Sequence, residues 1–113
     1  MSRAIRNSKT KNNWDSPEAG LDGLMQVLLC QEEVGWRKET TRIIVFITDA
    51  PCHIAGDGIM AGIWKPFEHQ CSLKLSSDGS RREYEGLDYD YPSLSEVDFL
   101  LSQSHLYCPN SPL

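Results

Sequence analysis

Residues 42–49 read Arg-Ile-Ile-Val-Phe-Ile-Thr-Asp, and this stretch decides the fold class of the 113-residue chain. Its apolar residues are β-branched or aromatic and follow one another without alternation, as in a central parallel strand covered on both faces. Before it, apolar residues recur at the spacing of a core-facing helix over residues 16–31. Asp15 can cap this helix, Pro17 fits its first turn, and Glu18 can complete a capping box.

The second half of the chain predicts a long connection and another helix. Glycines and prolines interrupt the connection, with short turns expected around residues 59–64, and the polar residues 76–90 read as a solvated loop. Ser93 and Glu96 form a second capping box that opens a helix through about residue 103. Helix, strand, loop and helix indicate an α/β fold. Since no second convincing strand follows, we expect an incomplete sheet and a larger parent protein.

Composition narrows the classes of partner. The net charge of −5 argues against nucleic acid, which is bound by clustered lysines and arginines. No signal peptide or membrane-spanning segment can be read, which favours the cytosol. The four cysteines, at positions 30, 52, 71 and 108, instead favour an oxidising compartment, where disulfides form. Composition alone therefore does not decide where the protein is located.

Oxygen-bearing side chains gather at two places that a cation site would use. Asn13, Asp15 and Glu18 lie within six residues at the predicted helix start, and Asp49 ends the predicted strand. Ligands of open α/β sheets bind beyond the carboxyl ends of the strands, and Ca²⁺ and Mg²⁺ prefer carboxylate, amide and carbonyl oxygens. A plain capping box for Asp15 and Glu18, and a turn role for Asp49, remain the competing interpretation.

Two further readings involve cysteine and histidine. Cys52-His53 and His69-x-Cys71 could form a Cys₂His₂ zinc site in a small interaction module, although the sequence has no C-x₂-C spacing. A Cys52-His53 nucleophile pair has no orienting third group, so we expect no enzymatic activity.

The segment Asn-Trp-Asp-Ser-Pro-Glu-Ala-Gly-Leu-Asp at residues 13–22 resembles the Asn-x-Asp-Ser/Ala-Pro-Glu-Gly-Gly-Phe/Leu-Asp segment of integrin beta subunits. More matches follow in order over residues 12–103: Met25-Gln26, Gly35-Trp36-Arg37, Thr48-Asp49-Ala50, His53-x-Ala55-Gly56-Asp57-Gly58, Ala61-Gly62-Ile63, Gln70-Cys71 and Asp90-Tyr91-Pro92-Ser93. The resemblance implies part of the I-like, von Willebrand factor A-type domain. That fold is doubly wound and Rossmann-like, here with an incomplete parallel sheet.

The resemblance also implies a site. Asn13, Asp15, the carbonyl of Pro17 and Glu18 would hold Ca²⁺, and Glu18 would also reach the adhesion metal, Mg²⁺ or Mn²⁺. Asp49 would lie near that metal. By the same resemblance Cys30 pairs with Cys71 in a disulfide, whereas Cys52 and Cys108 have no family counterpart.

Partners and location follow from the resemblance as well. An integrin alpha subunit would pair with the complete protein, and extracellular-matrix or cell-surface proteins would be its ligands, on the outer side of the plasma membrane. The expected division is a lead-in over 1–12, a partial I-like domain over 13–104 and a divergent tail over 105–113. The family's Asp-x-Ser-x-Ser loop is missing, since residues 78–82 read Asp-Gly-Ser-Arg-Arg.

Overall fold

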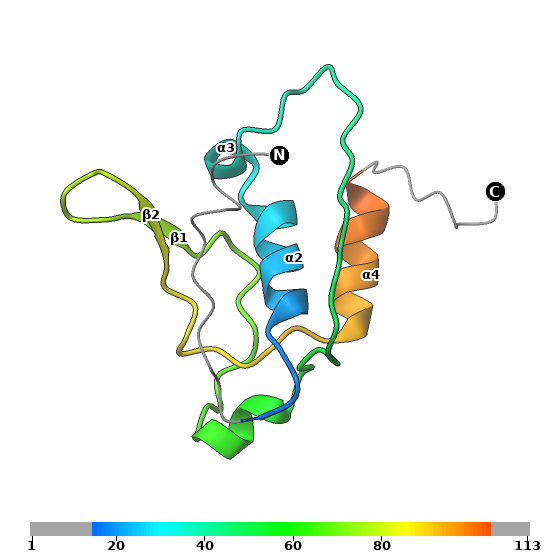
Figure 1. Ribbon diagram of the computed structural model, residues 1–113, viewed down its shortest axis with the longest axis vertical. Coiled ribbons are helices and arrows are strands. Elements are labelled where there is room, and N and C mark those ends of the chain that lie inside the picture. The colour runs from blue at the N-terminus through cyan, green and yellow to red at the C-terminus, as the bar shows by residue number, and fades with distance from the viewer. Residues whose placement is uncertain (1–14, 105–113) are drawn as a thin grey trace.

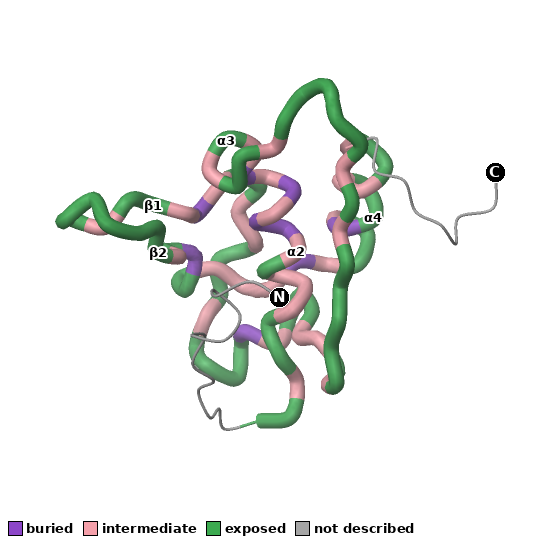
Figure 2. Tube along the Cα trace, turned by 45° about the horizontal axis from the view of Figure 1, so that its top comes forward, coloured by how far each residue is buried: buried purple, intermediate pink, exposed green. Residues whose placement is uncertain are grey.

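This computed structural model describes residues 15–104, and most of its core lies between two helices that contact each other, α2 (Gly20–Leu29) and α4 (Leu94–Gln103). The two helices run side by side in the same direction (Figure 1). The other elements are α3 (Gln31–Val34), the 3₁₀ helix η1 (Asp57–Ala61) and the strands β1 (Leu73–Leu75) and β2 (Arg82–Tyr84). Figure 2 shows the buried residues concentrated along α2 and the segments beside it. Among the described residues, no helix is long and apolar enough to cross a membrane.

Helix α2 confirms the predicted apolar stripe but not the predicted bounds. Met25 and Leu28 are buried in the core, where Val97 of α4 is buried too. The helix begins at Gly20, four residues later than expected, and its N-cap Ala19 receives no side-chain hydrogen bond. The capping box of Asp15 and Glu18 is therefore wrong. The reason is that residue 18 bonds elsewhere, through its backbone, to the segment 51–53.

Residues 42–49 do not form the predicted covered strand. The segment is drawn out as a long trace in Figure 1, yet it has no strand assignment and no strand beside it in the described chain. Ile43, Val45 and Ile47 are largely exposed. A strand needs a neighbour to satisfy its backbone groups, and none of the described segments supplies one. The doubly wound, Rossmann-like parallel sheet is accordingly not confirmed.

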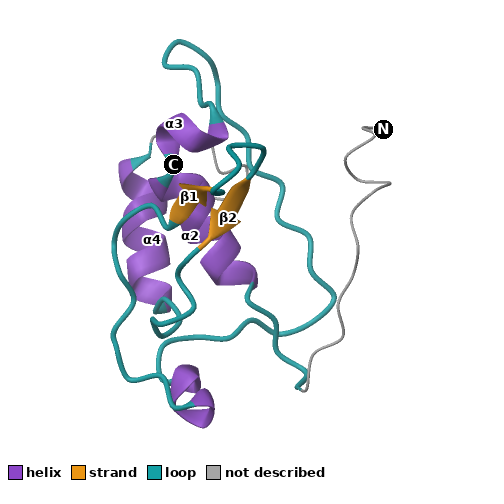
Figure 3. Ribbon diagram, turned by 90° about the vertical axis from the view of Figure 1, so that its left-hand side faces the viewer, coloured by secondary structure: helices purple, strands orange, loops and turns teal. Residues whose placement is uncertain are grey.

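The sheet that does form is an antiparallel hairpin. Leu73 of β1 lies opposite Tyr84 of β2, and Leu75 lies opposite Arg82. Figure 1 shows this hairpin on the side of α2 away from α4, and Figure 3 shows its two strands nearest the viewer, in front of the helices. The expectation of a solvated loop over residues 76–90 is thus wrong where β2 forms, although most of that stretch is exposed. At the hairpin tip, Ser76 Oγ and the Ser80 backbone donate to Asp78, and these bonds lower the pKa of Asp78 to about 2.

Helix α4 is the helix predicted from its capping box. The Glu96 N–H donates to Ser93 Oγ at 3.3 Å, and the Ser93 N–H donates to a Glu96 carboxylate oxygen at 2.7 Å. His69 lies 2.6 Å from the other Glu96 oxygen. The reciprocal bonds satisfy backbone donors that a helix start leaves unpaired.

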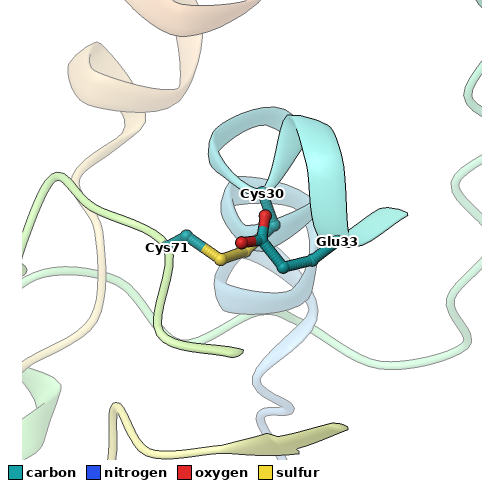
Figure 4. Close-up of side chains that lie close together, drawn as sticks. All are labelled: Cys30, Glu33 and Cys71. Carbon is teal, nitrogen blue, oxygen red and sulfur yellow. A yellow bond between two sulfur atoms is a disulfide. The ribbon is translucent and has the colours of Figure 1, made fainter. Parts of the chain in front are cut away.

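The disulfide between Cys30 and Cys71 confirms the pairing that the resemblance implies. Their Cα atoms are 4.8 Å apart, and the bond ties the end of α2 to the chain entering β1 (Figure 4). Beside it the buried Gln26 amide accepts a hydrogen bond from the Ser72 N–H at 2.8 Å. Because Cys71 is in the disulfide, it has no thiolate to offer zinc, and the predicted Cys₂His₂ site is wrong.

Candidate functional site

An acidic cleft of about 580 Å³ lies where the start of the described chain meets η1 and the segment before α4. Its lining residues come from these regions and from the loop before η1: Asp15, Pro17, His53, Asp57, Gly58, Met60, Ala61 and Tyr91. The backbone of Glu18 joins the start of the described chain to that loop. Its N–H donates to the Pro51 carbonyl at 2.8 Å, and its carbonyl accepts from the His53 N–H at 2.9 Å.

His53 is the central side chain of the acidic cleft. Its Nε2 lies 3.0 Å from an Asp15 oxygen, and its Nδ1 lies 3.1 Å from an Asp57 oxygen. The ring also stacks on Tyr91, with centroids 4.5 Å apart. Held on three sides, the imidazole side chain is only 13% exposed. One ring therefore links the two carboxylates that line the cleft.

Asp57 and Asp90 fold the loop that carries this histidine. The Ile54 N–H donates to Asp57 at 3.0 Å, and that bond, followed by the His53 contact, lowers the pKa of Asp57. Asp90 accepts from the N–H groups of Gly56 at 2.6 Å, Gly58 at 2.8 Å and Tyr91 at 2.8 Å. Gly58 is required there, because a Cβ at that position would sit 2.6 Å from an Asp90 oxygen.

The electrostatic character of the acidic cleft is negative. Burial raises the pKa of Tyr91, and the nearby carboxylates raise that pKa further. They belong to Asp15, Asp22, Asp57 and Asp90. A phenolate is disfavoured beside negative charges, whereas a cation is favoured there. The arrangement suits a positively charged ligand.

The predicted ligands occupy different parts of this region. Asp15 and Pro17 line the acidic cleft, and Glu18 forms a parallel bridge with Cys52. Asp49 is exposed in a bend two residues before Pro51, whose carbonyl holds the Glu18 backbone. Asn13 lies outside the described residues. The backbone thus brings positions 18 and 49 into one neighbourhood, and the Asp15 carboxylate turns to His53.

The described residues near the acidic cleft offer the oxygen atoms that a hard cation prefers. Their side-chain ligand atoms, however, do not meet at one point. Over residues 15–104, a single group of three histidine, cysteine or acidic side chains has its ligand atoms within 4.8 Å of one another: Cys30, Cys71 and Glu33 (Figure 4). Two of these are joined as a disulfide, so this group is no metal site. Carboxylate and carbonyl oxygens, the type of ligand that hard cations prefer, are present at Asp15, Pro17 and Glu18.

Three residues in or beside the acidic cleft were not assigned a role from the sequence: Asp57, Asp90 and Tyr91. His53 was considered only as a zinc ligand or as the partner of a Cys52 nucleophile, not as a link between carboxylates. The signal that could have found them is the pair of motifs His53-x-Ala55-Gly56-Asp57-Gly58 and Asp90-Tyr91-Pro92. They lie more than thirty residues apart in the chain, and only folding shows that the second motif holds the first.

Comparison with known proteins identifies the domain. Residues 1–108 match the family described as the integrin beta chain VWA domain. The chain is 42% identical over 94 residues to integrin beta-2 of Bos taurus, which covers 83% of this chain and 11% of that protein. It is 38% identical over 104 residues to integrin beta-7 of Homo sapiens, covering 92% of this chain and 12% of the relative.

An insect relative gives the same result. Integrin beta-PS of Drosophila melanogaster is 35% identical over 98 residues, which is 87% of this chain and 11% of that protein. The chain therefore spans about a tenth of the length of the relatives it matches. With the disulfide and the acidic cleft described above, these matches show that the chain belongs to the integrin beta family and corresponds to part of its VWA domain.

Proposed function

We propose that this chain is part of a non-enzymatic cell-adhesion receptor and contributes oxygen ligands to a divalent-cation site. In the complete protein it would pair with an integrin alpha subunit and bind matrix or cell-surface proteins outside the plasma membrane. Family membership supports the adhesion role. One observation carries the cation role: the backbone of Glu18 is anchored to residues 51–53 beside a negative cleft that Asp15 and Pro17 line.

The residues that we propose as cation ligands are those that the resemblance to integrin beta subunits implies. Asn13, Asp15, the Pro17 carbonyl and Glu18 would hold Ca²⁺, and Glu18 with Asp49 would serve Mg²⁺ or Mn²⁺. When bound, such a cation would neutralise the carboxylates and leave a coordination position for an acidic group of the adhesion ligand. The chain's own contribution is to hold Glu18 through two backbone hydrogen bonds and to orient Asp15 by its contact with His53.

Calcium titration calorimetry tests the cation site. We expect Glu18→Gln to weaken Ca²⁺ binding by about tenfold or more, which corresponds to at least about 1.4 kcal/mol, because a neutral amide replaces a charged ligand. Glu39→Gln is the matched control, since Glu39 is exposed and lies outside the proposed site. Equal Ca²⁺ affinity in both variants, or no Ca²⁺ binding by the unmodified chain, would contradict the proposal.

We expect that this chain by itself does not bind an adhesion ligand. Mg²⁺ gives up water reluctantly and needs near-octahedral ligands, and the sequence has no Asp-x-Ser-x-Ser loop to provide them. A labelled Arg-Gly-Asp peptide should therefore show no EDTA-sensitive change in fluorescence anisotropy. An Arg-Gly-Glu peptide serves as control. Tight, EDTA-sensitive binding that Glu18→Ala abolishes would show that the loop is dispensable.

A further inference from the structure

Asp22 is the acidic side chain through which helix α2 holds the hairpin. Tyr84, the last residue of β2, donates a hydrogen bond from its hydroxyl to Asp22 Oδ2 at 2.8 Å. The two residues are 62 positions apart, so the bond joins distant parts of the chain. Gly86 makes room for it, because a Cβ there would collide with the Tyr84 hydroxyl. The hairpin therefore reaches α2 through one phenol and one carboxyl group.

The other oxygen of Asp22 has no such bond. Asp22 Oδ1 is buried and makes no hydrogen bond within residues 15–104. Gln26, one turn later on α2, does not supply a donor, since its Nε2 makes no hydrogen bond to any described residue either. None of the described ion pairs includes Asp22. A charged carboxylate removed from water is costly when an oxygen lacks a donor, whereas a protonated carboxyl group carries no charge.

Two opposing effects act on the charge of Asp22. Its place in the first turn of α2 favours a negative charge, and so does the bond from Tyr84. Burial acts the other way and is the larger effect, since the pKa of Asp22 is raised overall. The titratable groups facing it are Tyr84 of β2 and Tyr91 before α4. Burial first, and then acidic neighbours, raise the pKa of both phenols, so they stay neutral.

We propose that the Asp22–Tyr84 contact is a pH-sensitive attachment of the hairpin: proton binding by Asp22 fixes the hairpin to α2, and proton loss favours its release. The buried, unbonded oxygen is the reason, because it is tolerated in a neutral carboxyl group and costly in a charged one. The proposal does not depend on the cation site, because Asp22 is not among the proposed ligands.

The direction of the pH effect follows from proton linkage. When the hairpin leaves α2, Asp22 meets water and its pKa returns to the ordinary value of about 3.9. Since the attached form has the raised pKa, the contact stabilises the hairpin fully below that ordinary value. This stability is lost as the pH rises through the raised pKa. Asp90 has the opposite sign, because its pKa is lowered in the folded chain.

Native-state hydrogen exchange of the full chain, corrected for the chemical exchange rate of each amide, measures opening of the hairpin. We expect the opening constant of residues 72–75 and 82–85 to rise at least about threefold from about pH 4 to about pH 7. Asp22→Asn removes the titrating group and should leave the opening constant independent of pH. Asp98→Asn is the matched control, because Asp98 is an exposed carboxylate on α4 and its loss should leave the pH dependence in place.

Carbon-13 NMR of the Asp22 carboxyl group gives a readout in the unmodified chain. Its titration midpoint should lie above the ordinary value of about 3.9. Tyr84→Phe keeps the ring but removes the donor that stabilises the charged form, so the midpoint should move further up. Three outcomes would overturn the proposal: a midpoint at or below the ordinary value, an opening constant of the unmodified chain that does not change with pH, or a pH dependence that persists in Asp22→Asn.

Discussion

Replacing both Cys30 and Cys71 with alanine should lower the free energy of unfolding by about 4 kcal/mol. The two residues are 41 positions apart, so the disulfide closes a long loop and removes much conformational freedom from the unfolded chain. A single domain of this size is stable by only about 5–15 kcal/mol. The loss of this one bond is therefore a large fraction of the total.

The small core makes the disulfide more important. In the described chain the buried apolar side chains are few, and one belongs to the disulfide itself: Met25, Leu28, Cys30, Pro92 and Val97. Cys30 is completely buried, so alanine is preferable to serine, whose hydroxyl would need a new partner there. The cross-link also keeps Ser72 beside the buried Gln26 amide, a contact between distant parts of the chain.

Urea unfolding under non-reducing conditions measures the effect. Cys52→Ala is the matched control, because Cys52 is a free cysteine of intermediate exposure and its loss removes no cross-link. We expect the control to change the free energy of unfolding by about 1 kcal/mol or less. Equal urea midpoints for the double variant and the control would show that the disulfide contributes little.

Replacing Asp90 with alanine should lower the free energy of unfolding by about 2 kcal/mol and loosen the acidic cleft. Asp90 is the shared acceptor for Gly56, Gly58 and Tyr91, and it connects two segments more than thirty residues apart. Without its carboxylate, three backbone donors lose their partner, and the one on Gly58 is partly buried. The loop that carries His53 and Asp57 would then keep its backbone bonds to Glu18 and Pro92 but lose the bonds of Gly56 and Gly58 to Asp90.

The pH dependence of this variant has a definite sign. Removal from water raises the pKa of Asp90, but the three backbone bonds outweigh that effect and the pKa is lowered overall. A carboxyl with a lowered pKa in the folded state stabilises the protein above its unfolded pKa of about 3.9, and that contribution disappears as the pH falls through the folded pKa. The difference between the unmodified chain and Asp90→Ala should therefore shrink in acid.

Unfolding curves at neutral pH and in acid provide the measurement. Asp88→Ala serves as control, because Asp88 is a neighbouring exposed carboxylate and should change the free energy of unfolding by less than about 0.5 kcal/mol. If Asp90→Ala and Asp88→Ala are equally stable at neutral pH, the three hydrogen bonds do not hold the loop. A stability difference that persists unchanged in acid would instead contradict the role assigned to the charge.

Local patterns in the sequence determined the features whose physics is local. The apolar spacing of residues 21–29 determined the buried face of α2, because side chains three and four positions apart share one side of a helix. The Ser93 and Glu96 capping box determined the start of α4, since both of its bonds lie within four residues. The family and the Cys30–Cys71 pairing followed from a resemblance spread along the chain.

Only the tertiary structure decided the features that depend on distant partners. Residues 42–49 have the composition of a buried strand, but a strand exists only where a neighbour takes up its backbone hydrogen bonds, and the described chain offers none. Asp15 and Glu18 have the spacing of a capping box, yet His53 and residues 51–53 hold them instead. The free energy of these contacts is gained across more than thirty residues of chain, so no short stretch of sequence reveals it.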